Sequence, residues 1–186
     1  IHKVIMVDSE TNTISFQDLF KYAEGNVLVF GKFASYWMEE NKHILVELKK
    51  VFDNLYYQVD LSEYKAERID ATLLMAMKFY FDNFYIAEHE HFIIEPILIC
   101  DNYYVDKDEA KIKILLNKIA TGAAHEQSED QYFKDADEHY STIRSVFSSG
   151  KWNIEKLFER MCKHTVDISR KATAGYELGK MYMPQY

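Results

Sequence analysis

The chain has 186 residues, a formal net charge of −8, and a composition of 48% hydrophobic, 15% aromatic and 28% charged residues. This length fits one compact domain with an extension, and this composition excludes an intrinsically disordered chain. The negative charge disfavours binding to a nucleic-acid backbone, and no local basic patch offsets it. No apolar run approaches the roughly 18 residues of a membrane span. We therefore expect neither a nucleic-acid partner nor a membrane-spanning segment.

The two cysteines, Cys100 and Cys162, form neither a CxxC pair nor a metal-ligand spacing. Either a reducing compartment or chance explains that usage. The chain begins at Ile1 rather than methionine, for which removal of an organellar presequence is one explanation. We expect an intracellular location, with an organellar one as the alternative.

The first predicted elements are a hairpin over 2–16, a short helix over 17–24 and a β-α-β unit. In that unit, strand patterns over 27–33 and 55–61 flank a helix over 37–52, whose apolar residues recur every three or four positions. A right-handed crossover makes its two strands parallel neighbours.

The later elements are predominantly helical, and the composition changes after Gly122. This change divides the chain into an α/β domain over 1–122 and a helical extension with a C-terminal tail over 123–186. The predicted elements are helices over 62–85, 109–121, 132–150 and 154–168, and strands over 93–100 and 103–105.

Four short motifs add to this order of elements. They are Val7-Asp8 with Ile14–Leu19, Val27–Phe33 with Ala34–Trp37, Val59-Asp60, and Glu95-Pro96-Ile97. Together they resemble the thioredoxin-like fold, in its peroxiredoxin and thiol-disulfide branch, over residues 3–121. The resemblance implies a central mixed sheet flanked by helices, and it places Pro96 where the family carries a cis-proline.

The chain departs from this family at the redox site. Where the family carries a CxxC pair, Trp37 is followed by Met38, Glu39, Glu40 and Asn41. A thiolate is the nucleophile of that chemistry, and neither methionine nor glutamate replaces it. The resemblance therefore implies a redox-inactive domain without a cofactor and favours a non-enzymatic role.

The aromatic content points to a protein partner. Fourteen tyrosines and twelve phenylalanines are more than a core of this size can bury, and tyrosine is favoured at interfaces. The leading hypothesis is a non-catalytic subunit or adaptor of a larger protein assembly.

A metal-dependent nuclease is the first alternative. Val46-Glu47-Leu48-Lys49 spells the ExK element of the PD-(D/E)xK nucleases, in which carboxylates hold a divalent metal and the lysine positions the attacking water. This function requires a strand over 44–51 and an aspartate in the strand before it. The helical period and the absence of aspartate from 27–37 favour an exposed charge pair on a helix.

Metal binding through His89, His91 and Glu95 is the second alternative, because the HxH spacing puts two imidazoles on one face of a strand. Glu88 and His91 also form one ExxH pair of the kind found in di-iron bundles. Both patterns lack a second half, so a polar loop before the 93–100 strand is favoured. The remaining histidines that we expect at the surface are His125, His139 and His164.

Overall fold

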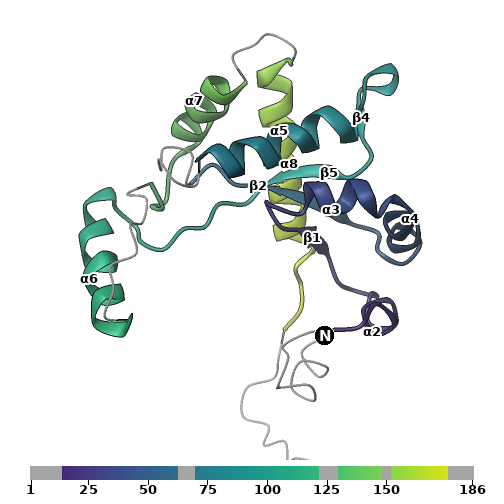
Figure 1. The fold of residues 1–186 in the computed structure, drawn as a ribbon, viewed down its shortest axis with the longest axis horizontal. Helices are drawn as coiled ribbons and strands as arrows, with labels where there is room; N and C mark the ends of the chain where they lie inside the picture. Colours follow the sequence, from purple (N-terminus) through teal and green to yellow (C-terminus); the bar gives the residue numbers. More distant parts are fainter. Residues whose placement is uncertain (1–13, 63–69, 122–129, 148–151, 176–186) are drawn as a thin grey trace, which may run out of the picture.

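The computed structural model describes residues 14–62, 70–121, 130–147 and 152–175 (Figure 1). The predicted hairpin over 2–16 lies almost wholly outside these residues. The boundary predicted between 122 and 123 lies at the edge of another undescribed stretch, so the two-part division stays a prediction.

A three-stranded sheet occupies the centre of the protein. Its strands are β1 (Leu28–Phe30), β2 (Leu55–Val59) and β5 (Glu95–Leu98), in the order β1-β2-β5. Both pairs are parallel, with Leu28 opposite Leu55 and Tyr57 opposite Pro96. The predicted parallel pairing across the β-α-β unit is therefore confirmed.

The expectation of a mixed sheet is not met among the described strands. The antiparallel pair, β3 (Tyr85–Ile86) with β4 (His91–Phe92), forms a separate two-stranded sheet. Parallel strands need a long crossover connection, and the helix α5 (Asp70–Phe84) lies in the chain between β2 and β5. This connection allows β5 to run parallel to β2. None of the described peptide bonds is cis, so Pro96 is not the expected cis-proline.

The helix predicted over 37–52 is interrupted at Asn41. It consists of α3 (Ser35–Glu40) and α4 (Lys42–Val51). The Asn41 side chain donates a 2.8 Å hydrogen bond to the carbonyl of Trp37, and its backbone leaves the helical region at φ −115° and ψ 34°. Asparagine side chains that bond nearby backbone groups compete with helical hydrogen bonding, which explains the break.

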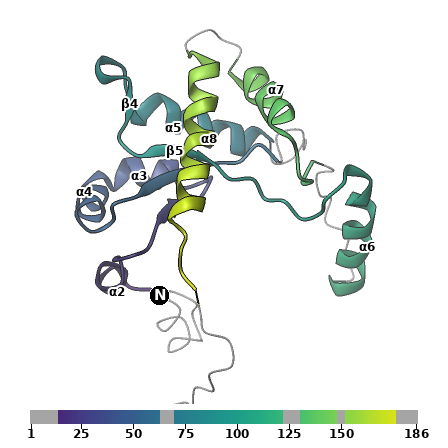
Figure 2. The same ribbon diagram turned by 180° about the vertical axis from the view of Figure 1, so that it is seen from behind.

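Two helices cover opposite faces of the sheet, as Figures 1 and 2 show. The ring of Tyr57 in β2 stacks on Tyr80 of α5, with centroids 3.9 Å apart. The neighbouring Tyr56 packs on His164 of α8 (Ile154–Lys171), with centroids 5.2 Å apart. Successive side chains of a strand point to opposite faces, so α5 and α8 lie on the two sides.

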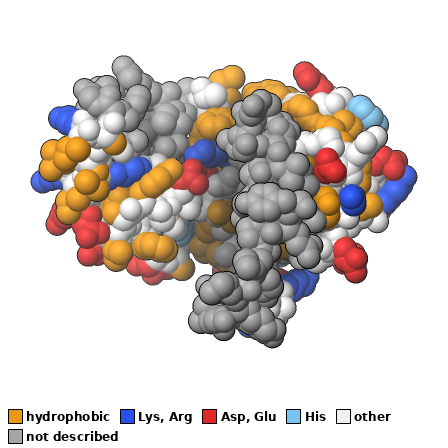
Figure 3. Space-filling view, turned by 90° about the horizontal axis from the view of Figure 1, so that it is seen from below, with side chains coloured by type: hydrophobic (Ala, Val, Ile, Leu, Met, Phe, Trp, Pro, Cys, Tyr) orange, Lys and Arg blue, Asp and Glu red, His pale blue; other side chains and the backbone are white. Residues whose placement is uncertain are grey.

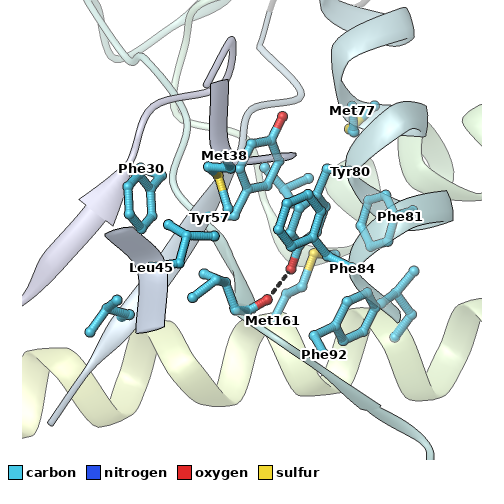
Figure 4. Close-up of a cluster of buried hydrophobic side chains, with 14 of the residues drawn as sticks. Phe30, Met38, Leu45, Tyr57, Met77, Tyr80, Phe81, Phe84, Phe92 and Met161 are labelled. Carbon is cyan, nitrogen blue, oxygen red and sulfur yellow. Dashed lines mark hydrogen bonds between the residues drawn. The ribbon is translucent and has the colours of Figure 1, made fainter. Parts of the chain in front are cut away.

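One hydrophobic core joins these layers, and Figure 4 shows its centre. The Tyr80 hydroxyl donates a 2.5 Å hydrogen bond to the carbonyl of Ile94 inside it. Residues of α7 (Ala136–Val146) and α8, including Ile143 and Met161, belong to the same cluster. Helix α8 therefore packs on the sheet, and α7 joins the same core beside α8. Three short elements are α2 (Phe16–Lys21) and the 3₁₀ turns η1 (Ala87–His89) and η2 (Lys107–Glu109).

The helix α6 (Ala110–Thr121) lies away from the sheet, at the end of a long connection from β5 (Figures 1 and 2). The edge strand predicted over 103–105 is absent from both sheets, because Tyr104 forms only an isolated bridge to Tyr132. Of the helices in the described ranges, none combines the length and apolarity needed to cross a membrane.

Candidate functional site

Three charged residues meet at the carboxyl ends of the parallel strands, where open α/β sheets bind their ligands. Lys32 follows β1, Asp60 follows β2 and Asp101 lies just beyond β5. The Lys32 Nζ donates to Asp60 Oδ2 at 2.6 Å and to Asp101 Oδ2 at 2.8 Å. This cluster connects the ends of all three strands.

The Asp60 carboxylate is fully buried and bonded on several sides. Its side chain is 0% exposed, and its Oδ1 accepts hydrogen bonds from the Ser62 amide at 2.9 Å and the Ser62 hydroxyl at 2.6 Å. Burial alone would raise the pKa of Asp60, but the bonds from Lys32 and Ser62 outweigh it and hold the pKa below its usual value. The carboxylate is thus ionised at neutral pH, and its hydrogen-bond partners belong to the chain itself, which indicates a structural role. We call the ion-paired group Lys32, Asp60 and Asp101 the clasp.

Cys100 and His139 lie together beside this clasp, although 39 positions separate them in sequence. The distance from Cys100 Sγ to His139 Nδ1 is 4.0 Å. Burial raises the pKa of the thiol to about 12, and burial together with Lys134 lowers the pKa of the imidazole. Both groups are therefore neutral at pH 7, which disfavours an activated thiolate. Nothing in the sequence signalled this pairing, and His139 is half-buried rather than at the surface as expected.

The segment that the resemblance placed at a CxxC position contains two packing residues and two acidic ones. Trp37 stacks on Phe16 with ring centroids 6.2 Å apart, and the Met38 side chain is buried in the core. Glu39 pairs with Lys42 at 2.5 Å, and Glu40 is exposed. Trp37, Met38 and Glu39 thus have structural contacts, and Glu40 faces solvent.

Pro96 is part of β5, and its backbone carbonyl contacts a side chain of α8. Its carbonyl lies 2.8 Å from His164 Nδ1. His164, expected at the surface, is thus held between β5 and Tyr56, with 17% of its side chain exposed.

The residues of the ExK element lie in helix α4. Glu47 accepts a 2.6 Å hydrogen bond from Lys50, and Lys49 donates a 2.7 Å bond to the carbonyl of Ile93. Residues two apart on a helix point in different directions, whereas on a strand they share a face. The strand that the nuclease hypothesis requires over 44–51 is therefore absent.

The two histidines of the second alternative lie near each other, with ring centroids 5.6 Å apart. Glu95 instead faces α8, where its Oε2 lies 2.8 Å from Arg160 Nε. Among the described residues, no group of three or more His, Cys, Asp or Glu side chains is placed to hold a metal ion. His89 and His91 thus lack the third ligand that the sequence pattern assigned to Glu95.

The largest unexplained feature is on α6. Ile112, Leu115, Leu116 and Ile119 follow one another at positions i, i+3, i+4 and i+7, which places them on one face. Their exposed fractions are 57%, 57%, 58% and 73%. We call these four residues the α6 stripe. The sequence predicted this apolar face, but such faces normally lie on a core, and this one is turned outward.

Further apolar side chains surround the α6 stripe. Tyr103, Val105 and Phe133 are 60%, 63% and 65% exposed. A groove of about 500 Å³ runs from Tyr103 and Val105 to Ile112 and Leu116 of the α6 stripe. Figure 3 shows hydrophobic, basic and acidic side chains interspersed on the lobe that contains α6, at the left of the view.

The base of α6 is fixed by hydrogen bonds. Asp106 and Glu109 form a capping box at the turn that leads into α6. The Tyr104 hydroxyl accepts a 3.1 Å bond from the Gln131 amide, and the Phe133 amide donates a 3.3 Å bond to Val105. The apolar surface is therefore presented on a connected framework.

Comparison with known proteins adds no family to these observations. The chain matches no protein-family model, and a search of curated proteins returned no match.

Proposed function

We propose that this chain is a non-catalytic, redox-inactive subunit or adaptor that binds a protein partner through α6 and its adjoining loops. One observation carries the proposal: all four residues of the α6 stripe are more than half exposed. Large apolar patches are uncommon on the surfaces of monomers and mark interaction sites. Anchors at i, i+3, i+4 and i+7 are also the pattern by which amphipathic helices bind protein grooves.

The chemistry of the rest of the protein supports a binding role. The segment 38–41 contains no thiol, and Met38 in it is a core residue. The pKa of Cys100 is about 12, so its thiol is protonated at pH 7 and is a poor nucleophile.

The thioredoxin-like relationship stays a proposal of its own. The order of strand, helix, strand, helix and strand supports it. The parallel direction of β5 and the absence of a cis peptide before Pro96 differ from what the resemblance implied. The binding role rests on α6 and is independent of this relationship.

Native purification followed by size-exclusion chromatography with light scattering tests the proposal. The test variant is Leu115→Glu/Leu116→Glu, and the matched control is Val46→Glu/Met75→Glu. The control residues, in α4 and α5, are 56% and 61% exposed, close to the 57% and 58% of the test pair. We expect a co-eluting protein, identified by mass spectrometry, with wild type and the control but not with the test variant. A monomer in all three preparations, or a complex that the test variant retains, would contradict the proposal.

A further inference from the structure

We propose that the occupant of the α6 stripe is an amphipathic helix of a partner protein whose apolar face is flanked by acidic side chains. This inference rests on the proposed function and adds the chemistry of the partner. Its first support is the charge of α6, which carries three lysines and no acidic residue although the whole chain has a net charge of −8. The acidic residues of the preceding turn, Asp106, Asp108 and Glu109, lie only at the N-terminal end of α6. The helix itself is thus a basic element on an acidic protein, which favours an acidic partner along its length.

The lysines lie beside the α6 stripe. At about 100° per residue, Lys111 and Lys118 both fall within about 60° of Leu115 around the helix axis. Both side chains are exposed, and neither forms an ion pair with another described residue. They are positioned to meet carboxylates at the rim of an interface whose centre is the α6 stripe.

Lys113 occupies the other side of α6 and shapes the groove. Its Nζ lies 3.2 Å from the centroid of the Tyr103 ring and 2.7 Å from Gln131 Oε1. These contacts hold the Tyr103 ring beside the groove of about 500 Å³, which ends at Ile112 and Leu116. A groove of this size accepts a large apolar side chain, so one anchor of the partner helix has a place to insert.

The same charges disfavour a second copy of the chain. If two α6 helices packed antiparallel along their stripes, Lys111 of one copy would face Lys118 of the other. Like charges across a helix pair are repulsive, and each copy also carries a net charge of −8.

An anionic membrane is disfavoured for a related reason. Outside α6 the chain is more acidic than its net charge of −8 indicates, because α6 contributes only lysines. An extended anionic surface also meets the acidic body beside α6, whereas a single partner helix meets only α6, and one short basic helix gives weak membrane binding.

Two synthetic peptides of about 20 residues, long enough to be helical, test the inference. Both carry leucine at the a and d positions of three heptads; one has glutamate and the other lysine at the flanking e and g positions. Fluorescence anisotropy titrations use the full chain and the labelled peptides at low and high salt. We expect the glutamate peptide to bind at least about tenfold more tightly than the lysine peptide, with the difference shrinking at high salt.

Two variants of the full chain make the result specific. Lys111→Glu/Lys118→Glu should reverse the preference between the peptides, and Leu115→Glu/Leu116→Glu should abolish binding of both. Equal binding of the two peptides, absence of binding, or a preference unchanged in the lysine variant would overturn the inference.

A second copy of the chain or a membrane on the α6 stripe would each give a different experimental result. A dimer in light scattering that Leu115→Glu/Leu116→Glu dissociates would assign the surface to a second copy. Sedimentation with phosphatidylcholine–phosphatidylserine vesicles, lost in Lys111→Glu/Lys118→Glu, would assign it to a membrane. Either result overturns the inference.

The outcomes also separate this inference from the proposed function. Suppose that a native partner is lost only in Leu115→Glu/Leu116→Glu, but that the chain shows no preference for the glutamate peptide. The proposed function would then be supported, and the inference of an acidic partner helix would be wrong. A native partner that Leu115→Glu/Leu116→Glu still binds would contradict both the proposed function and the inference of an acidic partner helix.

Discussion

The Nζ of Lys32 lies 2.6 Å from Oδ2 of Asp60, and this bond joins the carboxyl ends of β1 and β2 inside the protein. The Asp60 side chain is 0% exposed and that of Lys32 is 15% exposed. Their contact is therefore shielded from solvent, and removal of one partner would leave the charge of the other largely buried and uncompensated.

Replacing Asp60 with asparagine should destabilise the fold. Asp60→Asn removes the negative charge but leaves Lys32 largely buried, and loss of one partner of such a pair costs about 3 kcal/mol of unfolding free energy. Urea unfolding at pH 7 measures this loss. The matched control is Asp101→Asn, which removes the Lys32 partner whose side chain is 38% exposed and should cost at most about 1 kcal/mol. Equal costs for the two variants would contradict the buried clasp.

The contribution of Asp60 should also depend on pH. Its pKa in the folded protein is below the ordinary value of 3.8, so the folded state holds the proton less tightly than the unfolded state. The stabilisation is fully present above that ordinary value and is lost as the pH falls below it through the lowered folded pKa. Urea unfolding of wild type and Asp60→Asn between pH 7 and pH 3 should show the two curves converging at the acidic end. A stability difference that stays constant down to pH 3 would mean that the Asp60 pKa is not lowered.

The Cys100 thiol should react slowly in the folded protein. Burial raises its pKa to about 12, so the reactive thiolate is scarce at pH 8. Labelling with an aromatic disulfide at pH 8, followed by peptide mass spectrometry, should show Cys162 modified well before Cys100, and both modified rapidly in urea. Cys162 is the internal control, because both cysteines are half-buried but the pKa of Cys162 is raised less, and by burial alone. Labelling of Cys100 at the rate of an unhindered thiol would argue against a redox-inactive domain.

The hydroxyl of Tyr80 should stabilise the core. It donates a 2.5 Å bond to the Ile94 carbonyl, and both residues are buried (Figure 4). Tyr80→Phe leaves that carbonyl without its donor at a cost of about 1–2 kcal/mol of unfolding free energy, measured in urea. Tyr103→Phe, at a side chain 60% exposed, should change stability by less than about 0.5 kcal/mol. A neutral Tyr80→Phe would show that the bond contributes nothing to the core.

Local periodicity predicted the β-α-β unit because apolar spacing reports directly on which face of a segment is buried. The direction of β5 was beyond that reasoning, since it depends on how the chain crosses the sheet after α5. For the same reason the arrival of Asp101 beside Lys32 and Asp60 went unpredicted, because residues that follow the carboxyl ends of strands share one edge of a sheet only when the strands are parallel. The break at Asn41 is a local effect that the polar residue itself could have signalled.

The α6 stripe shows a different limit of sequence reasoning. The spacing of Ile112, Leu115, Leu116 and Ile119 predicted an apolar helix face correctly. Periodicity says that such a face must be covered, but it does not say whether the chain's own core or another molecule covers it. Only the arrangement in space, with α6 away from the sheet, makes the second case the better proposal (Figure 1).

Site-specific photo-crosslinking tests the central claim most directly. A benzoylphenylalanine residue is placed at Ile119, which is 73% exposed at the end of the α6 stripe, and in a matched sample at Val46, which is 56% exposed on α4. Irradiation of cells that produce each form should crosslink position 119, and not position 46, to a second protein species. Equal crosslinking at both positions, or a product at position 119 that contains only this chain, would contradict the account.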